Sequence, residues 1–275
     1  MSLLAWIILF TALGGVASAL AASLFLIAPE TIRARALPHL VSFATGALLG
    51  AALLGLLPDA IQSVGLEGAH RIGFTLLVGV LIFFVLEKLL LWRHCHADVC
   101  EGHVPLSHGA HSHNESNDDH AHAKNRDAAS ASLVLIGDSF HNILDGVLIA
   151  AAFLTDIHLG VVTSMAVVAH EIPQEVGDFA ILLNGGMSRA KALTLNVATS
   201  LTSVVGGVAA YYSLEGTQQV LPYAIALAAS SFLYIAVADL IPGLHRRVDP
   251  GSGVKQILLI TLGVGVIFVS HSLAH

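Results

Sequence analysis

The chain has 275 residues, of which 55% are hydrophobic and only 11% are charged. Soluble globular domains carry about a quarter charged residues, so this composition excludes a soluble enzyme or a nucleic-acid-binding domain and indicates a protein whose main partner is the lipid bilayer. The net charge of -7 counts all sixteen histidines as neutral. This histidine content is unusual, and histidine is the commonest metal ligand among side chains.

Eight apolar runs are long enough to cross a membrane, which takes about 20 mostly apolar residues. They lie at residues 3–28, 38–57, 71–92, 131–154, 159–183, 190–212, 219–241 and 254–273. The first run resembles a signal peptide in its small residues, but no lysine or arginine precedes it and it is too long, so we interpret it as a retained helix. The sequence therefore predicts an all-α integral membrane protein with eight transmembrane helices.

The basic residues predict the orientation, because lysine and arginine concentrate on the cytoplasmic side. With both termini on the extracytoplasmic side, only Arg71 falls outside. The other eleven basic residues then lie on the cytoplasmic side: Arg33, Arg35, Lys88, Arg93, Lys124, Arg126, Arg189, Lys191, Arg246, Arg247 and Lys255.

One long polar loop, residues 93–130, divides the chain into a first part with three helices (1–92) and a second part with five (131–275). The loop has too few apolar residues to bury a core, so we expect disorder there. It carries eight histidines, and close pairs such as His111 and His113 can capture a divalent cation weakly. A metal-buffering or metal-sensing role is the favoured interpretation, and a solvated linker that is merely histidine-rich is the alternative.

Two of the predicted helices carry a stripe of polar side chains. Residues three and four positions apart share a helix face, and both helices show that spacing. The fourth helix contributes Asp138, His141, Asn142 and Asp145, and the fifth contributes His170, Glu171, Gln174, Glu175 and Asp178. An ionised aspartate at the centre of a bilayer costs about 2.5–3.5 kcal/mol, so these side chains must face each other or water.

Neither apolar run contains a lysine or arginine that could neutralise the acids. A bound cation or protons must therefore supply the positive charge. Pro173 also indicates a site here, because proline removes a backbone hydrogen bond and interrupts the helix. Interrupted helices at mid-membrane often mark substrate sites. The alternative is that the proline only bends the helix for packing. Imidazole and carboxylate ligands favour zinc, with iron, manganese and cadmium as competitors; magnesium and calcium prefer all-oxygen shells.

The segments "HNILDG" in the fourth helix and "HEIPQEVGDFAIL" in the fifth resemble the two signature segments of the ZIP (Zrt-, Irt-like) metal transporters. The segments "GALLGAALLGLLPDA" and "SSFLYIAVADLIPGL" are also similar to that family, and the closest branch reads HExPHE in its fifth helix. The resemblance implies a binuclear metal centre between helices four and five, both termini outside, a histidine-rich cytoplasmic loop and a homodimer. It assigns the centre to His141, Asn142, Asp145, His170 and Glu171.

The chain departs from that branch at Gln174, where the branch has its second histidine. Asn196 in the sixth helix stands where some relatives supply a further ligand, and a packing role is equally compatible with it. By analogy with the family, helices one, four, five and six move as a unit against the other four.

We therefore expect a transporter that moves a divalent metal ion, zinc foremost, into the cytoplasm, and no enzymatic activity. One alternative is an intramembrane zinc metalloprotease, since His170 and Glu171 begin an HExxH signature, but Gln174 replaces its second histidine. The other is a membrane metal sensor that does not transport. The expected location is a bacterial inner membrane first and an internal eukaryotic membrane second.

Overall fold

The computed structural model describes residues 1–94, 117–245 and 250–273, and within these ranges all regular structure is helical. The predicted all-α class is therefore confirmed for the described part of the chain. The predicted sites His111 and His113, and most of the long loop, lie outside the described residues.

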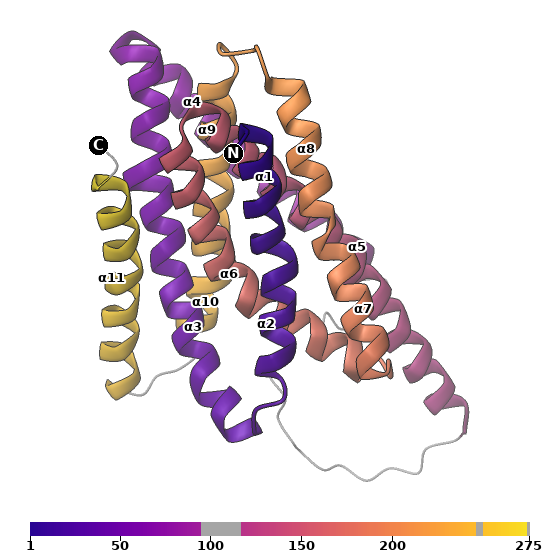
Figure 1. The fold of residues 1–275 in the computed structure, drawn as a ribbon. Helices are drawn as coiled ribbons and strands as arrows, with labels where there is room; N and C mark the ends of the chain where they lie inside the picture. Colours follow the sequence, from indigo (N-terminus) through magenta and orange to yellow (C-terminus); the bar gives the residue numbers. More distant parts are fainter. Residues whose placement is uncertain (95–116, 246–249, 274–275) are drawn as a thin grey trace.

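The helices follow one another as shown in Figure 1, with π-helical turns labelled η. They are α1 (Leu3–Ala12), η1 (Leu13–Ala17), α2 (Ser18–Phe25), α3 (Glu30–Gly50), η2 (Ala51–Leu56), α4 (Leu57–His94), α5 (Asn117–Thr155), α6 (Ile157–Asn184), α7 (Arg189–Ser200), α8 (Thr202–Leu214), α9 (Leu221–Tyr234), η3 (Ile235–Leu240), α10 (Ile241–His245) and α11 (Pro250–Ser272).

Six helical segments of the described chain are long and apolar enough to cross a membrane, which makes this a multi-pass membrane protein. They are Leu3–Phe25, Glu30–Leu89, Val134–Thr155, Arg189–Leu214, Leu221–His245 and Ser252–Ser272. The second is 60 residues long and is interrupted at Gly65, whose φ of 70° and ψ of 174° are not helical. Since about 20 residues suffice for one crossing, this segment has the length of two predicted helices joined by a turn.

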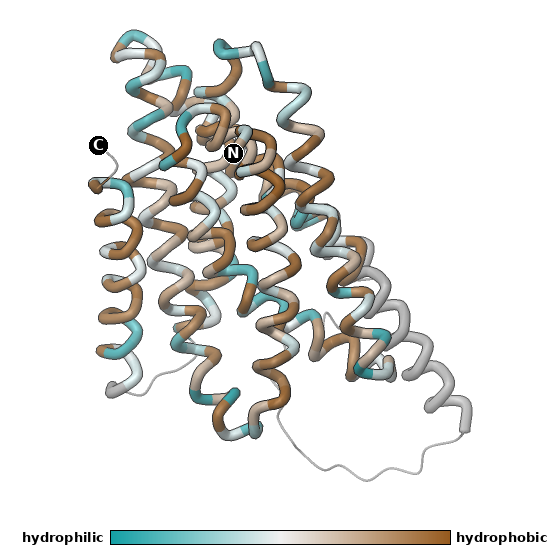
Figure 2. Tube along the Cα trace, viewed as in Figure 1, coloured by the Kyte–Doolittle hydropathy of each residue, from teal (hydrophilic) through white to brown (hydrophobic). Residues whose placement is uncertain are grey.

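Helix α6 is not among these six segments, although its 28 residues are enough for a crossing. Its middle carries the polar stripe, which lowers its hydropathy. Figure 2 shows hydrophilic positions midway along α6, while most of the surrounding helices are hydrophobic at that level. The prediction of eight crossings therefore stays a prediction.

The predicted start of the fourth transmembrane helix lies within the longer helix α5. The prediction placed the start of the helix at residue 131, whereas α5 begins at Asn117 and runs to Thr155. The prediction followed the apolar run, and a helix can extend from the membrane into a polar segment without any change in backbone geometry. The division of the chain at the long loop therefore stays a prediction.

The turn within α4 and the connection between α8 and α9 lie at the end of the bundle that is nearer the N-terminus (Figure 1). The connections between α2 and α3 and between α6 and α7 lie at the other end. These two pairs of connections therefore lie at opposite ends of the bundle.

Small residues allow helices α5 and α8 to pack closely. A Cβ atom added at Gly146 would collide with the backbone carbonyl of Ser203, and one added at Gly206 would collide with that of Ile143. Helix α5 also packs along α6, which brings the two polar stripes together.

Candidate metal centre

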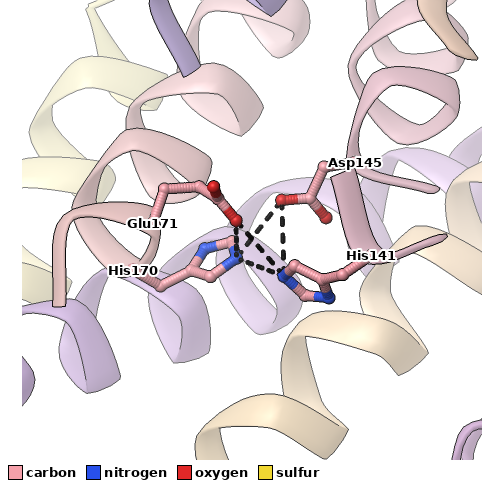
Figure 3. Close-up of side chains that lie close together, drawn as sticks. All are labelled: His141, Asp145, His170 and Glu171. Atoms are coloured by element: carbon pink, nitrogen blue, oxygen red, sulfur yellow. Dashed lines mark hydrogen bonds and ion pairs between the residues drawn. The ribbon is translucent and has the colours of Figure 1, made fainter. Parts of the chain in front are cut away.

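Four side chains from α5 and α6 converge on one point, as Figure 3 shows. His141 and Asp145 come from α5, one helical turn apart, and His170 and Glu171 are adjacent in α6. One donor atom from each residue lies within 4.8 Å of every other. The structure therefore brings four residues of the two polar stripes together.

The distances between the donor atoms are short and similar. His170 Nε2 lies 3.2 Å from Asp145 Oδ2, 3.6 Å from Glu171 Oε1 and 3.2 Å from His141 Nε2. His141 Nε2 lies 3.3 Å from Glu171 Oε1 and 3.8 Å from Asp145 Oδ2. Four of these five pairs join an imidazole nitrogen to a carboxylate oxygen, and the fifth joins the two imidazole nitrogens.

These distances suit a tetrahedral zinc ion. Zinc binds imidazole nitrogen and carboxylate oxygen at about 2.0–2.1 Å, which places tetrahedral ligand atoms roughly 3.3–3.4 Å from one another. The observed separations of 3.2–3.8 Å bracket that value. The four atoms, which all lie within 4.8 Å of one another, therefore surround a position where one small ion could contact each of them after adjustment of the side chains.

A backbone contact orients the imidazole of His170. Its Nδ1 lies 3.1 Å from the carbonyl oxygen of Ala166, an acceptor only, so Nδ1 carries the proton and donates to it. When the ring is neutral, the lone pair of Nε2 therefore faces the other three donors. Metal-binding histidines commonly use the second ring nitrogen in this way, and the ring edge of His170 also packs against Phe232.

Two buried carboxylates dominate the electrostatics of this cluster. The side chains of Asp145 and Glu171 are each 1% exposed, and none of their four oxygens has a hydrogen-bond partner. Neither α6 nor the apolar part of α5 contains a lysine or arginine. With two neutral imidazoles the four ligands carry two negative charges, which one divalent cation neutralises.

Asn142 and Asp138 lie beside the cluster and bind each other. The amide nitrogen of Asn142 donates to Asp138 Oδ1 at 2.8 Å and to its backbone carbonyl at 3.2 Å. The amide oxygen of Asn142 and Oδ2 of Asp138 are buried without a hydrogen-bond partner. Both side chains therefore keep one oxygen available.

Glu175 lies one turn beyond Glu171 and is fully buried. It accepts a hydrogen bond of 2.7 Å from Ser200 of α7, and its second oxygen has no hydrogen-bond partner. Asp138, Glu175 and Asp178 are all close enough to Glu171 to interact with it electrostatically. The centre thus continues into an acidic environment.

Gln174 lines a cavity of about 160 Å³ next to the cluster, between α6, α3 and η3. His170 and Pro173 form the α6 side of this cavity, and Asp239 lies on the η3 side. Asn196 of α7 is buried, and neither atom of its amide group has a hydrogen-bond partner.

Sequence reasoning missed Ser200 and Asp239. Ser200 follows Asn196 at a spacing of four, so the same rule that found the stripes in α5 and α6 would have placed both on one face of the sixth helix. Asp239 is a single acid in the apolar seventh run, where a charged residue marks a functional position.

Comparison with known proteins accords with this geometry. Residues 2–271 match the family described as ZIP Zinc transporter. The chain belongs to the ZIP family. This protein is 31% identical to zinc transporter ZIP13 of Gallus gallus, covering 86% of the present chain and 75% of that protein. It is 30% identical to zinc transporter zipt-7.1 of Caenorhabditis briggsae over 96% and 78% of the two chains, and 31% identical to ZIP13 of Homo sapiens over 86% and 71%.

Membership in the ZIP family confirms the expected class, a membrane transporter rather than an enzyme. The intramembrane protease alternative loses its basis, because that signature needs a second histidine ligand at position 174 and Gln174 stands there. These relatives are animal proteins and do not support the predicted bacterial inner membrane.

Proposed function

We propose that this ZIP protein carries a divalent metal ion, zinc foremost, across its membrane into the cytoplasm. The observation that carries the proposal is the four-donor cluster of His141, Asp145, His170 and Glu171, which lies between α6 and the apolar part of α5, where there is no lysine or arginine. The relatives named zinc transporters support zinc as the transported substrate.

The ion binds first to these four side chains, at mid-membrane. Because their two negative charges balance one divalent cation, binding removes the electrostatic penalty of burying the acids. Asn142, Gln174 and Glu175 lie around the cluster and complete or orient the ligand shell. Buried oxygens of Asp138, Asn142 and Glu175 without hydrogen-bond partners supply ligands for a second ion, as the binuclear centre of the family requires.

Transport needs the site to open to each side in turn. We propose eight crossings with both termini outside, in which α1–α2, α5, α6 and α7–α8 move against the remaining helices. The cavity bounded by Gln174 and Asp239 lies between α6 of the first set and η3 of the second, so it is the proposed point of exchange between the sets. His111 and His113 of the cytoplasmic loop are proposed to buffer or sense the ion, and the protein is proposed to act as a homodimer.

A competition uptake assay tests this function. The full chain is reconstituted in vesicles, and zinc uptake is measured with equal concentrations of iron, manganese, cadmium or magnesium outside. Zinc, cadmium, iron and manganese should compete because they accept mixed nitrogen and oxygen ligands, and magnesium should not. Zinc-dependent signalling without any uptake would support the sensor alternative instead.

A further inference from the structure

A second cavity, of about 700 Å³, lies where α2, α6 and α7 meet the start of α3. It is separate from the metal centre, because no residue of the four-donor cluster lines it. These helices meet at the end of the bundle that holds the α2–α3 and α6–α7 connections (Figure 1). The positive-inside distribution assigns that end to the cytoplasmic membrane surface.

The walls of this cavity are apolar, and part of them faces outward. Leu20 and Leu24 of α2 are 48% and 69% exposed, so the cavity is continuous with a surface that suits hydrocarbon chains. Phe179 and Leu183 of α6 form the inner wall and belong to a small apolar core at this end of the bundle.

Two arginines give the cavity its charge. Arg33 from the first turns of α3 and Arg189 from the start of α7 both line it, and no aspartate or glutamate does. Among the described residues neither guanidinium forms an ion pair, and Nε of Arg33 is buried without a hydrogen-bond partner. Arg189 also stands at the first position of a 12-residue helix, where free backbone N–H groups favour an anion.

This cavity is apolar along its length and carries two guanidinium groups at the membrane surface, without ion-pair partners in the described part of the chain. That combination fits an anionic lipid. A soluble anion would leave the apolar part of the cavity unfilled, so it fits less well than a lipid. A zwitterionic lipid also fits less well, because it does not neutralise two arginines. Basic pockets between transmembrane helices on the cytoplasmic side bind anionic lipid headgroups. Arginine is suited to phosphate because its planar group donates two parallel hydrogen bonds.

We propose that this cavity binds one anionic phospholipid, with its phosphate on Arg33 and Arg189 and an acyl chain along Leu20, Leu24, Phe179 and Leu183. Arg33 belongs to α3, whereas the other lining residues come from α2 and the two residues that follow it, from α6 and from α7. If the proposed movement of helix sets is correct, the lipid bridges the two sets and its binding depends on the transport state. The binding itself does not rest on that movement.

The test is native mass spectrometry of the full protein in a neutral detergent, with dioleoylphosphatidylglycerol and dioleoylphosphatidylcholine added in equal amounts. The two lipids have identical acyl chains, so the comparison isolates the headgroup. One basic side chain near the membrane surface contributes about a fivefold preference for an anionic lipid. With two arginines, the protein should retain one phosphatidylglycerol molecule with roughly 25-fold selectivity over phosphatidylcholine.

The double variant Arg33→Gln/Arg189→Gln should lose this selectivity. The matched control is Arg35→Gln/Lys191→Gln, which removes the same charge from the same two helices. Both control positions are exposed, and neither lines the cavity. The control should keep the selectivity. If the double variant does not fold, the single variant Arg189→Gln at the exposed helix start should reduce the selectivity about fivefold.

Three results would overturn the proposal. Equal retention of both lipids would mean that only hydrocarbon occupies the cavity. An equal loss in the control variant would assign the selectivity to general surface charge. Displacement of phosphatidylglycerol by millimolar sn-glycerol 3-phosphate would identify a site for a soluble phosphate rather than for a lipid.

Discussion

Replacing Asp145 by asparagine should remove most of the stabilisation that zinc gives to the folded protein. The substitution keeps the size of the side chain but reduces the charge of the four-donor cluster from two negative charges to one. It also replaces a carboxylate oxygen that lies 3.2 Å from His170 Nε2 by a neutral amide. Loss of a residue that only supports a metal ligand weakens binding 10–100-fold, so loss of a charged ligand should cost at least about 100-fold.

The expected effect on stability follows from the binding equilibrium. At a free zinc concentration of 100 times the dissociation constant, binding stabilises the wild-type protein by about 2.7 kcal/mol, and a 100-fold weaker variant gains only about 0.4 kcal/mol at that concentration. With about 2–4 °C per kcal/mol for a chain of this size, zinc should raise the melting temperature by roughly 5–11 °C in the wild type and by about 1–2 °C in the variant.

The assay is thermal unfolding of detergent-purified protein with and without zinc, so each variant is compared with its own metal-free form. Glu67→Gln is the matched control, because it also neutralises one acid but lies exposed on α4, away from the cluster. It should keep the full wild-type increment. An unreduced increment in Asp145→Asn would mean that zinc binds elsewhere, and the reasoning would be refuted.

Three further predictions concern transport, protons and packing. His170→Ala should abolish zinc uptake into vesicles while the protein still elutes as a folded species, and normal uptake would remove His170 from the site. Zinc affinity measured by calorimetry should fall steeply between neutral pH and about pH 5, because protons compete for the imidazoles and carboxylates; an unchanged affinity would contradict the ligand set. Gly146→Ala should reduce the free energy of unfolding by about 1–3 kcal/mol, because the added Cβ collides with the carbonyl of Ser203. Gly265→Ala is the control and should cause no such loss, because no heavy atom lies within 4 Å of the added Cβ. Equal melting temperatures for the two variants would contradict the close packing of α5 on α8.

The candidate metal site could be predicted from the sequence because the bilayer makes polar residues informative. His141 with Asp145, and His170 beside Glu171, stand out only against an apolar background with no basic residue. Helical spacing then fixes which of them share a face, so two stripes in consecutive helices predict a shared site. The structure brings together four of the residues that the stripes contain.

Contacts between helices distant in the sequence could not be predicted in the same way. Spacing within the sixth helix places Ser200 near Asn196 but does not reveal that Ser200 donates to Glu175 of the fifth. Likewise, nothing in the seventh run shows that Asp239 shares a cavity with Gln174. Such contacts depend on how the helices cross, and crossing follows from packing of small residues such as Gly146 and Gly206.

The helix limits were the least predictable feature of the fold. Apolar runs mark where a helix lies in the membrane, but the backbone hydrogen bonds of a helix are satisfied within itself and do not end at the membrane surface. The start of α5 at Asn117 shows this, since its first turns are polar in sequence.

The most direct test of the account is anomalous diffraction from crystals of the zinc-loaded protein, recorded at the zinc absorption edge. The account predicts an anomalous peak between α5 and α6, about 2.0–2.1 Å from His141 Nε2, Asp145 Oδ2, His170 Nε2 and Glu171 Oε1. Zinc bound only outside the membrane-spanning helices, with these four side chains free of metal, would contradict it.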